Sequence, residues 1–172
     1  ALNSVRAQTF GDWECIVIDD GSTDGGAEAA QKAIAGDARF RLHRQGNKGL
    51  AGARNAGLEL ARGRFVQFLD ADDELAPEKF LIQTEQLRGV SGLCAAYSDY
   101  DVFYDGRRSR LRITPRVIAE PVLYDIVSSW STHISIPAHC FLFDRRIFSE
   151  HGVRFDEGLR AGGEDWDCWL KI

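Results

Sequence analysis

The sequence has no methionine, and its four cysteines are far apart along 172 residues. They are Cys15, Cys94, Cys140 and Cys168, and no two of them form a C-x-x-C pair. This spacing indicates neither a zinc site nor a disulfide framework. We expect reduced thiols, buried where their neighbours are apolar, as in a reducing cytoplasm.

Long apolar runs and an excess of positive charge are also lacking. No run approaches the roughly 20 apolar residues of a membrane-spanning helix, and no signal peptide is visible. The formal net charge of −5 argues against nucleic acid as the main partner. We therefore expect a cytoplasmic protein. Basic clusters leave peripheral contact with the inner face of the plasma membrane open, although solvated faces are the simpler explanation: Arg107, Arg108, Arg110, Arg112, Arg145 and Arg146.

The chain has enough apolar sequence, 44%, for one core, so we predict a single domain over residues 1–172. Strands alternate with helices up to residue 113, which predicts an α/β fold with a mainly parallel sheet. Residues 114–172 are less regular, as expected of a recognition surface. Both ends lie inside helical patterns, and without an initiator Met we expect this sequence to be part of a longer chain.

Hydrophobic periodicity and turn residues predict the individual elements. The expected strands are residues 14–18, 39–43, 65–69, 93–97, 102–104, 108–113 and 141–143. The expected helices are residues 2–8, 26–35, 50–61, one that begins at Pro77, and 122–130. Asp105-Gly106 is a hairpin turn signal between two of the strands.

Acidic residues directly follow the apolar stretch 65–69, at Asp70, Asp72 and Asp73. In open α/β sheets ligands bind at the carboxyl ends of strands, and clustered carboxylates repel one another unless a cation joins them. Hard divalent cations take oxygen ligands, commonly one or two carboxylates plus substrate phosphates. The stretch therefore predicts a metal-diphosphate site. The alternative is an acidic loop in which Asp73 caps the next helix.

A second expected strand, residues 14–18, also runs into paired acids, Asp19 and Asp20. Gly21 and Ser22 then permit a tight turn that lets a ligand approach the backbone. Neighbouring parallel strands would bring both acidic sites to one crevice, where Asp19 and Asp20 could accept hydrogen bonds from a nucleobase or a ribose. An Asx-type turn with a helix cap is the alternative.

Between the two acidic sites lies a glycine-rich segment, residues 46–57. Its glycines let the backbone approach a phosphate, and the helix N-terminus with Lys48, Gly49 and Arg54 adds positive potential. The segment matches neither G-x-G-x-x-G nor the G-K-[ST] of a P-loop. Close packing of a helix on a sheet would explain its small residues equally well.

The last candidate is the segment Gly162–Asp167, where two glycines precede Glu164 and Asp165. A carboxylate here could face the crevice and act as a general base. The structural alternative is that the helix dipole favours acids in the first turn of a helix. His133 and His139 could touch an acceptor, but ordinary surface or core histidines are the simpler interpretation.

Together these motifs resemble the family 2 glycosyltransferases, inverting enzymes with the GT-A fold. The matching stretches are Gln8-Thr9-Phe10, Trp13-Glu14, Val17–Asp24, Asn47-Lys48-Gly49, Ala53–Gly57, Phe68–Asp73 and Glu164-Asp165-Trp166. The order and spacing of the whole set are specific, whereas each motif alone is not. The family begins with a strand and a Pro-x-Tyr/Phe-Asn turn that this sequence does not contain, and it continues beyond the position of Ile172.

The resemblance implies a three-layer α/β/α sandwich that binds a nucleotide sugar, foremost a UDP-sugar. The sugar would pass to a saccharide or lipid-linked acceptor in cell-surface polysaccharide or glycolipid synthesis. The resemblance also implies Asp165 as the catalytic base, Glu164 beside it, and Asp72 as a ligand of Mn²⁺ or Mg²⁺. The implied nucleotide-sugar contacts are Asp19, Asp20, Ser22, Lys48, Gly49, Arg54, Asp70 and Ala71.

Residues 1–113 would then form the nucleotide-sugar half of the domain and residues 114–172 the acceptor half. Two other functions stay open. The chain could be a nucleotidyltransferase that makes sugar nucleotides, or a module that binds a nucleotide sugar without catalysis.

Overall fold

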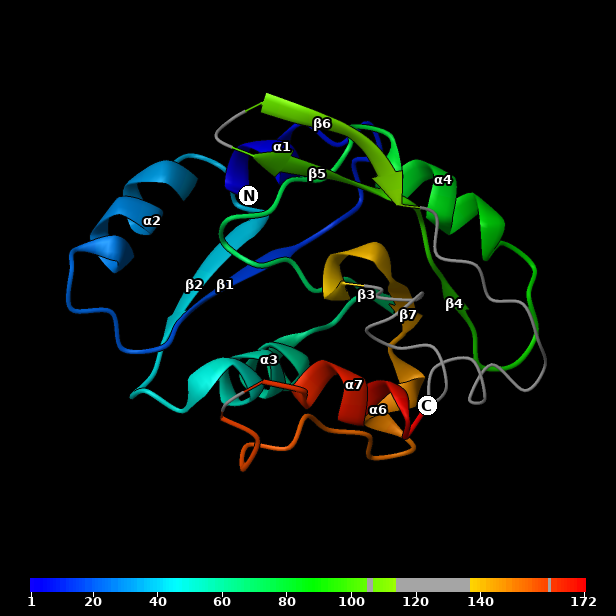
Figure 1. The fold of residues 1–172 in the computed structure, drawn as a ribbon. Coiled ribbons are helices and arrows are strands. Elements are labelled where there is room, and N and C mark those ends of the chain that lie inside the picture. Colours follow the sequence, from blue (N-terminus) through cyan, green and yellow to red (C-terminus); the bar gives the residue numbers. More distant parts are fainter. Residues whose placement is uncertain (105–106, 114–136, 161) are drawn as a thin grey trace.

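The computed structural model describes residues 1–104, 107–113, 137–160 and 162–172 (Figure 1). The helices are α1 (Leu2–Arg6), α2 (Gly26–Ile34), α3 (Gly49–Leu60), α4 (Lys79–Gln86), α6 (Arg146–Ser149) and α7 (Glu164–Trp169), with the 3-10 turn η1 (Ala138–Cys140). The strands are β1 (Cys15–Asp19), β2 (Phe40–Arg44), β3 (Phe65–Val66), β4 (Ala95–Ala96), β5 (Tyr100–Tyr104), β6 (Arg107–Ile113) and β7 (Leu142–Asp144). In Figure 1 the strands β1, β3 and β7 run between α3, α6 and α7 on one side and α1 and α4 on the other. Within the described ranges, no helix has the length and apolar character needed to cross a membrane.

The strands β1 and β2 form a parallel pair joined by α2. Their register sets Asp19 opposite Arg44. The turn from β1 into α2 uses Gly21 and Gly25 at φ of 81° and 82°, left-handed conformations that glycine adopts without steric cost. This unit confirms the expected local order, in which a strand ends at acidic residues and a glycine-containing turn leads into a helix.

The strand β7 comes from the far end of the sequence and lies antiparallel between β3 and β4. The strands β5 and β6 form the expected antiparallel hairpin, whose turn at 105–106 lies outside the described residues. The α/β class is confirmed, but the described ladders are more mixed than the mainly parallel sheet that we expected. The strand β7 lies within one residue of the strand expected at 141–143, but its place between β3 and β4 does not follow from the alternation of strands and helices, because its partners are distant in sequence.

Regular pairing covers less of the chain than the apolar runs do. The strand β3 ends at Val66 rather than at Leu69, and beyond it Phe68 is buried while Leu69 is partly exposed. The apolar residues of β1 are half-buried rather than buried on both faces. Within the described chain β1 pairs only with β2, which accounts for this exposure. The expected helix at 122–130 and His133 lie outside the described residues.

An aromatic cluster holds the C-terminal part of the chain against β3 and α3. Phe68 makes edge contacts with Phe148 and Phe155, at ring-centroid distances of 5.9 and 5.0 Å, and Trp169 of α7 stacks on Phe143 at 4.9 Å. These five side chains are between 2 and 7% exposed. Such pairs add about 0.5–1.5 kcal/mol each beyond the burial of their area. The cluster therefore fixes α7 relative to the segment that follows β3.

Candidate active site

The acid loop, residues Asp70–Asp73, follows the buried Phe68. The Asp73 N–H donates to the Asp70 carbonyl oxygen at 3.2 Å, which closes the loop into a turn. Asp70 is partly buried, whereas Ala71 and Asp72 are exposed. Asp72 has no hydrogen-bond or ion-pair partner among the described residues, so its carboxylate is free to bind a ligand.

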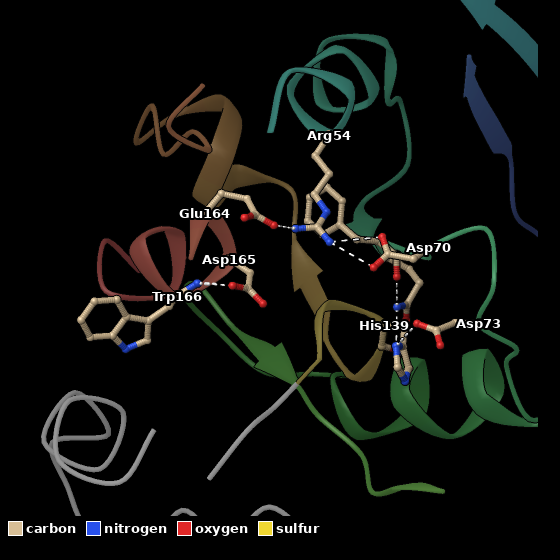
Figure 2. A network of polar contacts seen from close by, with 9 residues as sticks. Arg54, Asp70, Asp73, His139, Glu164, Asp165 and Trp166 are labelled. Atoms are coloured by element: carbon tan, nitrogen blue, oxygen red, sulfur yellow. Dashed lines mark hydrogen bonds and ion pairs between the residues drawn. The ribbon is translucent and has the colours of Figure 1, made fainter. Parts of the chain in front are cut away.

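Arg54, in the middle of α3, joins the acid loop to α7 (Figure 2). Its guanidinium donates to Glu164 Oε1 at 3.0 Å and to both Asp70 oxygens at 3.1 and 3.3 Å. The Arg54 side chain is 7% exposed, and its guanidinium carbon lies 5.3 Å from the centre of the Phe155 ring. A cation so withdrawn from water needs paired carboxylates. Residues 54, 70 and 164 therefore meet at one point of the fold.

The start of α7 separates the roles of its first two acids, Glu164 and Asp165. Gly162 and Gly163 have φ of 108° and 88°, so the turn before the helix suits glycine and no residue with a side chain. Glu164, 6% exposed, points inward to Arg54, whereas Asp165 is only partly buried. Asp165 Oδ1 accepts the Trp166 N–H at 2.7 Å, and its other oxygen has no partner in the described part of the chain. Asp165 is thus the acid of α7 that a hydroxyl group could reach.

Asp20 is tied to the start of α3. Its carboxylate accepts the backbone N–H groups of Lys48 and Gly49 at 2.9 and 2.8 Å and the Gln45 side-chain amide at 2.8 Å. From the sequence we proposed this helix N-terminus as a phosphate site. In the structure its N–H groups donate to Asp20 instead. A Cβ on Gly21 would lie 3.1 Å from the Asn47 nitrogen, so the close approach of the two loops favours glycine.

Asp19 is buried beside the same turn and holds it closed. Its Oδ1 accepts the Ser22 N–H at 3.0 Å, and its Oδ2 accepts from Arg44 Nε at 3.2 Å. The hydrogen bonds from Ser22, together with Arg44, lower the pKa of Asp19 below its ordinary value. The alternative that we gave for Asp19 and Asp20 was an Asx-type turn. The hydrogen bond from the Ser22 N–H to Asp19 agrees with that alternative.

His139, for which an ordinary histidine was the simpler interpretation of the sequence, lies at the site. Its Nδ1 lies 2.7 Å from Asp73 Oδ2, and Figure 2 shows the ring facing the acid loop. Asp73 therefore pairs with a histidine and does not cap α4, whose N-cap position is Glu78. The local sequence does not predict the contact between His139 and Asp73, because η1 and the acid loop are far apart along the chain.

The donor set fits a divalent cation only if a substrate shares the coordination. The described residues contain no group of three or more His, Cys, Asp or Glu side chains arranged to hold a metal ion. Asp70 is occupied by Arg54 and Asp73 by His139, which leaves Asp72 as the free carboxylate of the acid loop. Ions such as Mg²⁺ commonly bind to one or two carboxylates plus substrate phosphates. Asp72 with a diphosphate satisfies that pattern.

The fold is that of the GT-A glycosyltransferases. S. aureus TarS 1–349 in complex with UDP-GlcNAc matches with a TM-score of 0.74 and 20% identity, over 99% of this chain and 47% of that TarS chain. The mannosyltransferase PcManGT from Pyrobaculum calidifontis, in complex with GDP-Man and Mn²⁺, matches with a TM-score of 0.68 and 21% identity, over 97% of this chain and 45% of PcManGT. At these identities the similarity shows the fold alone.

Residues 1–152 match the family described as Glycosyl transferase family 2, and this chain belongs to that family. The succinoglycan biosynthesis protein ExoW from Rhizobium meliloti (strain 1021) is 36% identical over 191 residues, which cover 99% of this chain and 58% of ExoW. The chain spans about half the length of the curated relatives that it matches.

Proposed function

We propose that this chain is the nucleotide-sugar-binding and catalytic part of an inverting glycosyltransferase. It would transfer a sugar from a nucleoside diphosphate sugar to a hydroxyl group of an acceptor, with the help of a divalent cation. The observation that carries this proposal is the Arg54 bridge, because it brings the acid loop and α7 together. One carboxylate that Arg54 does not bind then stands on each side of the bridge, the exposed Asp72 for the cation and the partly buried Asp165 for the acceptor.

The relatives support the kind of donor and acceptor. TarS was solved with UDP-GlcNAc and PcManGT with GDP-Man and Mn²⁺, so both bind nucleoside diphosphate sugars. For this chain we propose a UDP-sugar as donor and Mn²⁺ or Mg²⁺ as cofactor. The name of ExoW supports an acceptor in polysaccharide biosynthesis, a saccharide or a lipid-linked saccharide. The reaction would take place in the cytoplasm, at the inner face of the plasma membrane where the acceptor is lipid-linked.

The proposed reaction is a single displacement. Asp165 takes the proton from the acceptor hydroxyl, which contributes about 10²–10⁴-fold to the rate. The acceptor oxygen forms a bond to the anomeric carbon as the bond from that carbon to the diphosphate oxygen breaks. The nucleoside diphosphate leaves with the electron pair, and the configuration inverts. A divalent cation, when bound, stabilises the negative charge of the leaving group.

The other residues of the site bind and orient. Asp70 and Glu164 are held by Arg54, which keeps the distance between the acid loop and α7 constant. The turn of Asp19, Asp20 and Ser22 is proposed to lie against the nucleoside. Lys48, Gly49 and Ala71 are proposed to line the path of the diphosphate.

Replacement of the proposed base tests the reaction. In Asp165→Asn, transfer should fall by at least about 10²-fold because no carboxylate takes the proton, while UDP binding should be unchanged. Asp167→Asn is the matched control, because Asp167 lies on the same helix and pairs with Lys171 instead. Turnover of Asp165→Asn close to that of the unaltered protein would make the base assignment wrong. Release of pyrophosphate instead of a nucleoside diphosphate would identify a nucleotidyltransferase.

A further inference from the structure

A buried polar cluster lies beside the acid loop and has no part in the reaction described above. It consists of Gln67, which follows β3, and of Lys79 and Gln83 on α4, and we call it the Lys79 cluster. Lys79 is 8% exposed and Gln83 is 2% exposed. The three side chains hydrogen-bond to one another: Lys79 Nζ donates to Gln67 Oε1 at 2.9 Å and to Gln83 Oε1.

The cluster converges on the backbone of one short turn, η1. Lys79 Nζ and Gln83 Nε2 donate to the Cys140 carbonyl oxygen at 3.2 and 2.9 Å. Gln67 Nε2 donates to the His139 carbonyl oxygen at 2.7 Å. Side chains from two segments thus hold two successive carbonyl groups, and η1 cannot shift without breaking bonds to both.

Stability alone does not account for a lysine at this position. Lys79 Nζ donates to three neutral oxygens, and burial lowers the pKa of Lys79 to about 8. An apolar side chain of similar volume often replaces a buried charge at no loss of stability or with a gain. The arrangement is instead suited to fixing a backbone geometry, since an ammonium group has three donors to distribute.

The turn η1 carries His139, whose ring lies beside the acid loop. Asp73 Oδ2 lies 2.7 Å from His139 Nδ1. Asp73 follows Asp72 directly and donates its own N–H to the Asp70 carbonyl oxygen. A partner that holds a ligand-bearing segment by hydrogen bonds typically changes metal affinity by about 10–100-fold when it is removed.

We infer that Lys79 is a positioning residue of the active site. Together with Gln67 and Gln83 it fixes η1, so that His139 holds Asp73 and the acid loop keeps Asp72 oriented toward the cation. The inference rests on the proposed function only in taking Asp72 as the ligand of the cation.

The first test measures the position of His139 without any ligand. Spectra of the ¹⁵N-labelled histidine rings of the full chain should show one ring held as its Nδ1–H form, assigned by its loss in His139→Asn. In Lys79→Met this signal should move toward that of a solvent-exposed histidine. Gln8→Leu is the matched control, because Gln8 is equally buried and holds the start of α4 through Ala76 and Phe80 but does not touch η1.

The second test measures the cation. In Lys79→Met the Mn²⁺ concentration that half-saturates UDP binding, followed by calorimetry, should rise about 10-fold or more, and in Gln8→Leu it should not change. Gln83→Glu gives a second variant should Lys79→Met fail to fold. It supplies Lys79 with a carboxylate partner but no longer donates to Cys140, so the same two defects should appear in a stable protein.

Two results would overturn the inference. One is an unchanged His139 signal in both Lys79→Met and Gln83→Glu. The other is a displaced His139 signal with the Mn²⁺ requirement of the unaltered protein. Failure of the proposed function is a separate outcome: the unaltered protein would then not bind UDP with Mn²⁺ at all, while the histidine spectra would still report whether the cluster holds His139.

Discussion

Arg54 combines a long charged side chain with almost complete burial, and its two carboxylate partners differ in their surroundings. The Glu164 side chain is 8% exposed, whereas that of Asp70 is 40% exposed. An exposed partner contributes little because water screens it. The pairing with Glu164 is therefore the part of the bridge that matters most for stability.

Arg54→Met should destabilise the protein by about 3 kcal/mol, because Glu164 would be left buried without a cation. Urea denaturation monitored by tryptophan fluorescence measures this change. Arg88→Met is the matched control, since Arg88 pairs with Glu85 and both side chains are exposed, so it should change the unfolding free energy little. Equal losses in both variants would contradict the role of burial.

Lys79 makes the stability of the protein depend on pH in the alkaline range. Its pKa falls from 10.5 to about 8 on folding because burial disfavours the charge. Between these values the unfolded chain binds more protons, so this contribution to stability rises with pH and is largest above pH 10.5. The difference in unfolding free energy between the native sequence and Lys79→Met should grow in favour of the native sequence by roughly 3 kcal/mol from pH 7 to above pH 10.

Denaturation of both proteins at several pH values under reducing conditions measures that difference. Burial raises the pKa of the Cys140 thiol to about 12 and that of Cys168 to about 12, so these groups destabilise the fold as the pH rises through the ordinary thiol range. Both thiols are present in both proteins, and their effect largely cancels. A difference that stays constant with pH would show that folding does not lower the pKa of Lys79.

At the scale of elements, α3 is the part around which the site is assembled. Its first turn donates to Asp20, its middle carries Arg54, and the next residue, Asn55, exchanges two hydrogen bonds with the backbone of Phe155 at 2.9 and 3.0 Å. One helix thus contacts the turn after β1, the acid loop and the segment that leads to α7. A displacement of α3 would change all three.

Asp20→Ala should cost about 2 kcal/mol, because the first N–H groups of α3 and the Gln45 amide lose a charged acceptor. Amide hydrogen exchange should quicken at Lys48 and Gly49 and stay slow at the far end of the helix. Asp24→Ala is the control: Asp24 is exposed and accepts only the Gly26 N–H at 2.9 Å, so its loss should have a smaller effect. Unchanged exchange at the start of α3 would contradict the anchoring role.

At the scale of the whole molecule, nucleotide and cation should act together on stability. A ligand that binds only the native state stabilises it by about 2.7 kcal/mol at 100 times its Kd. UDP with Mn²⁺ should therefore raise the melting temperature, and a chelator should remove the effect. Asp72→Ala should lose the Mn²⁺-dependent part, while Asp12→Ala, which removes an exposed acid elsewhere, should retain it. A shift in Asp72→Ala equal to that of the native sequence would argue against Asp72 as a ligand.

Much of the fold followed from the sequence because its signals are local. Apolar runs ending in acids, glycine turns and helical spacing gave β1, α2, α3 and the β5–β6 hairpin close to their observed places. The four thiols are free, but Cys15 and Cys94, which we expected to be buried among apolar neighbours, are partly exposed, and the buried thiols are Cys140 and Cys168. The insertion of β7 between β3 and β4 did not follow, because it depends on packing between distant segments.

By itself the sequence determined that acids follow two apolar stretches and that the chain resembles family 2, since motif order and turn chemistry depend on neighbouring positions. Only the tertiary structure decided which acids are free to act. Arg54 pairs with Asp70 and with Glu164, which is 110 positions away. The start of α3 donates to Asp20, and His139 pairs with Asp73. Asp72 is left exposed, and Asp165, which is partly buried, keeps one carboxylate oxygen without a partner among the described residues. The physical reason is competition: a buried cation or N–H group is satisfied by whichever carboxylate the packing brings within reach, and local sequence does not set that distance.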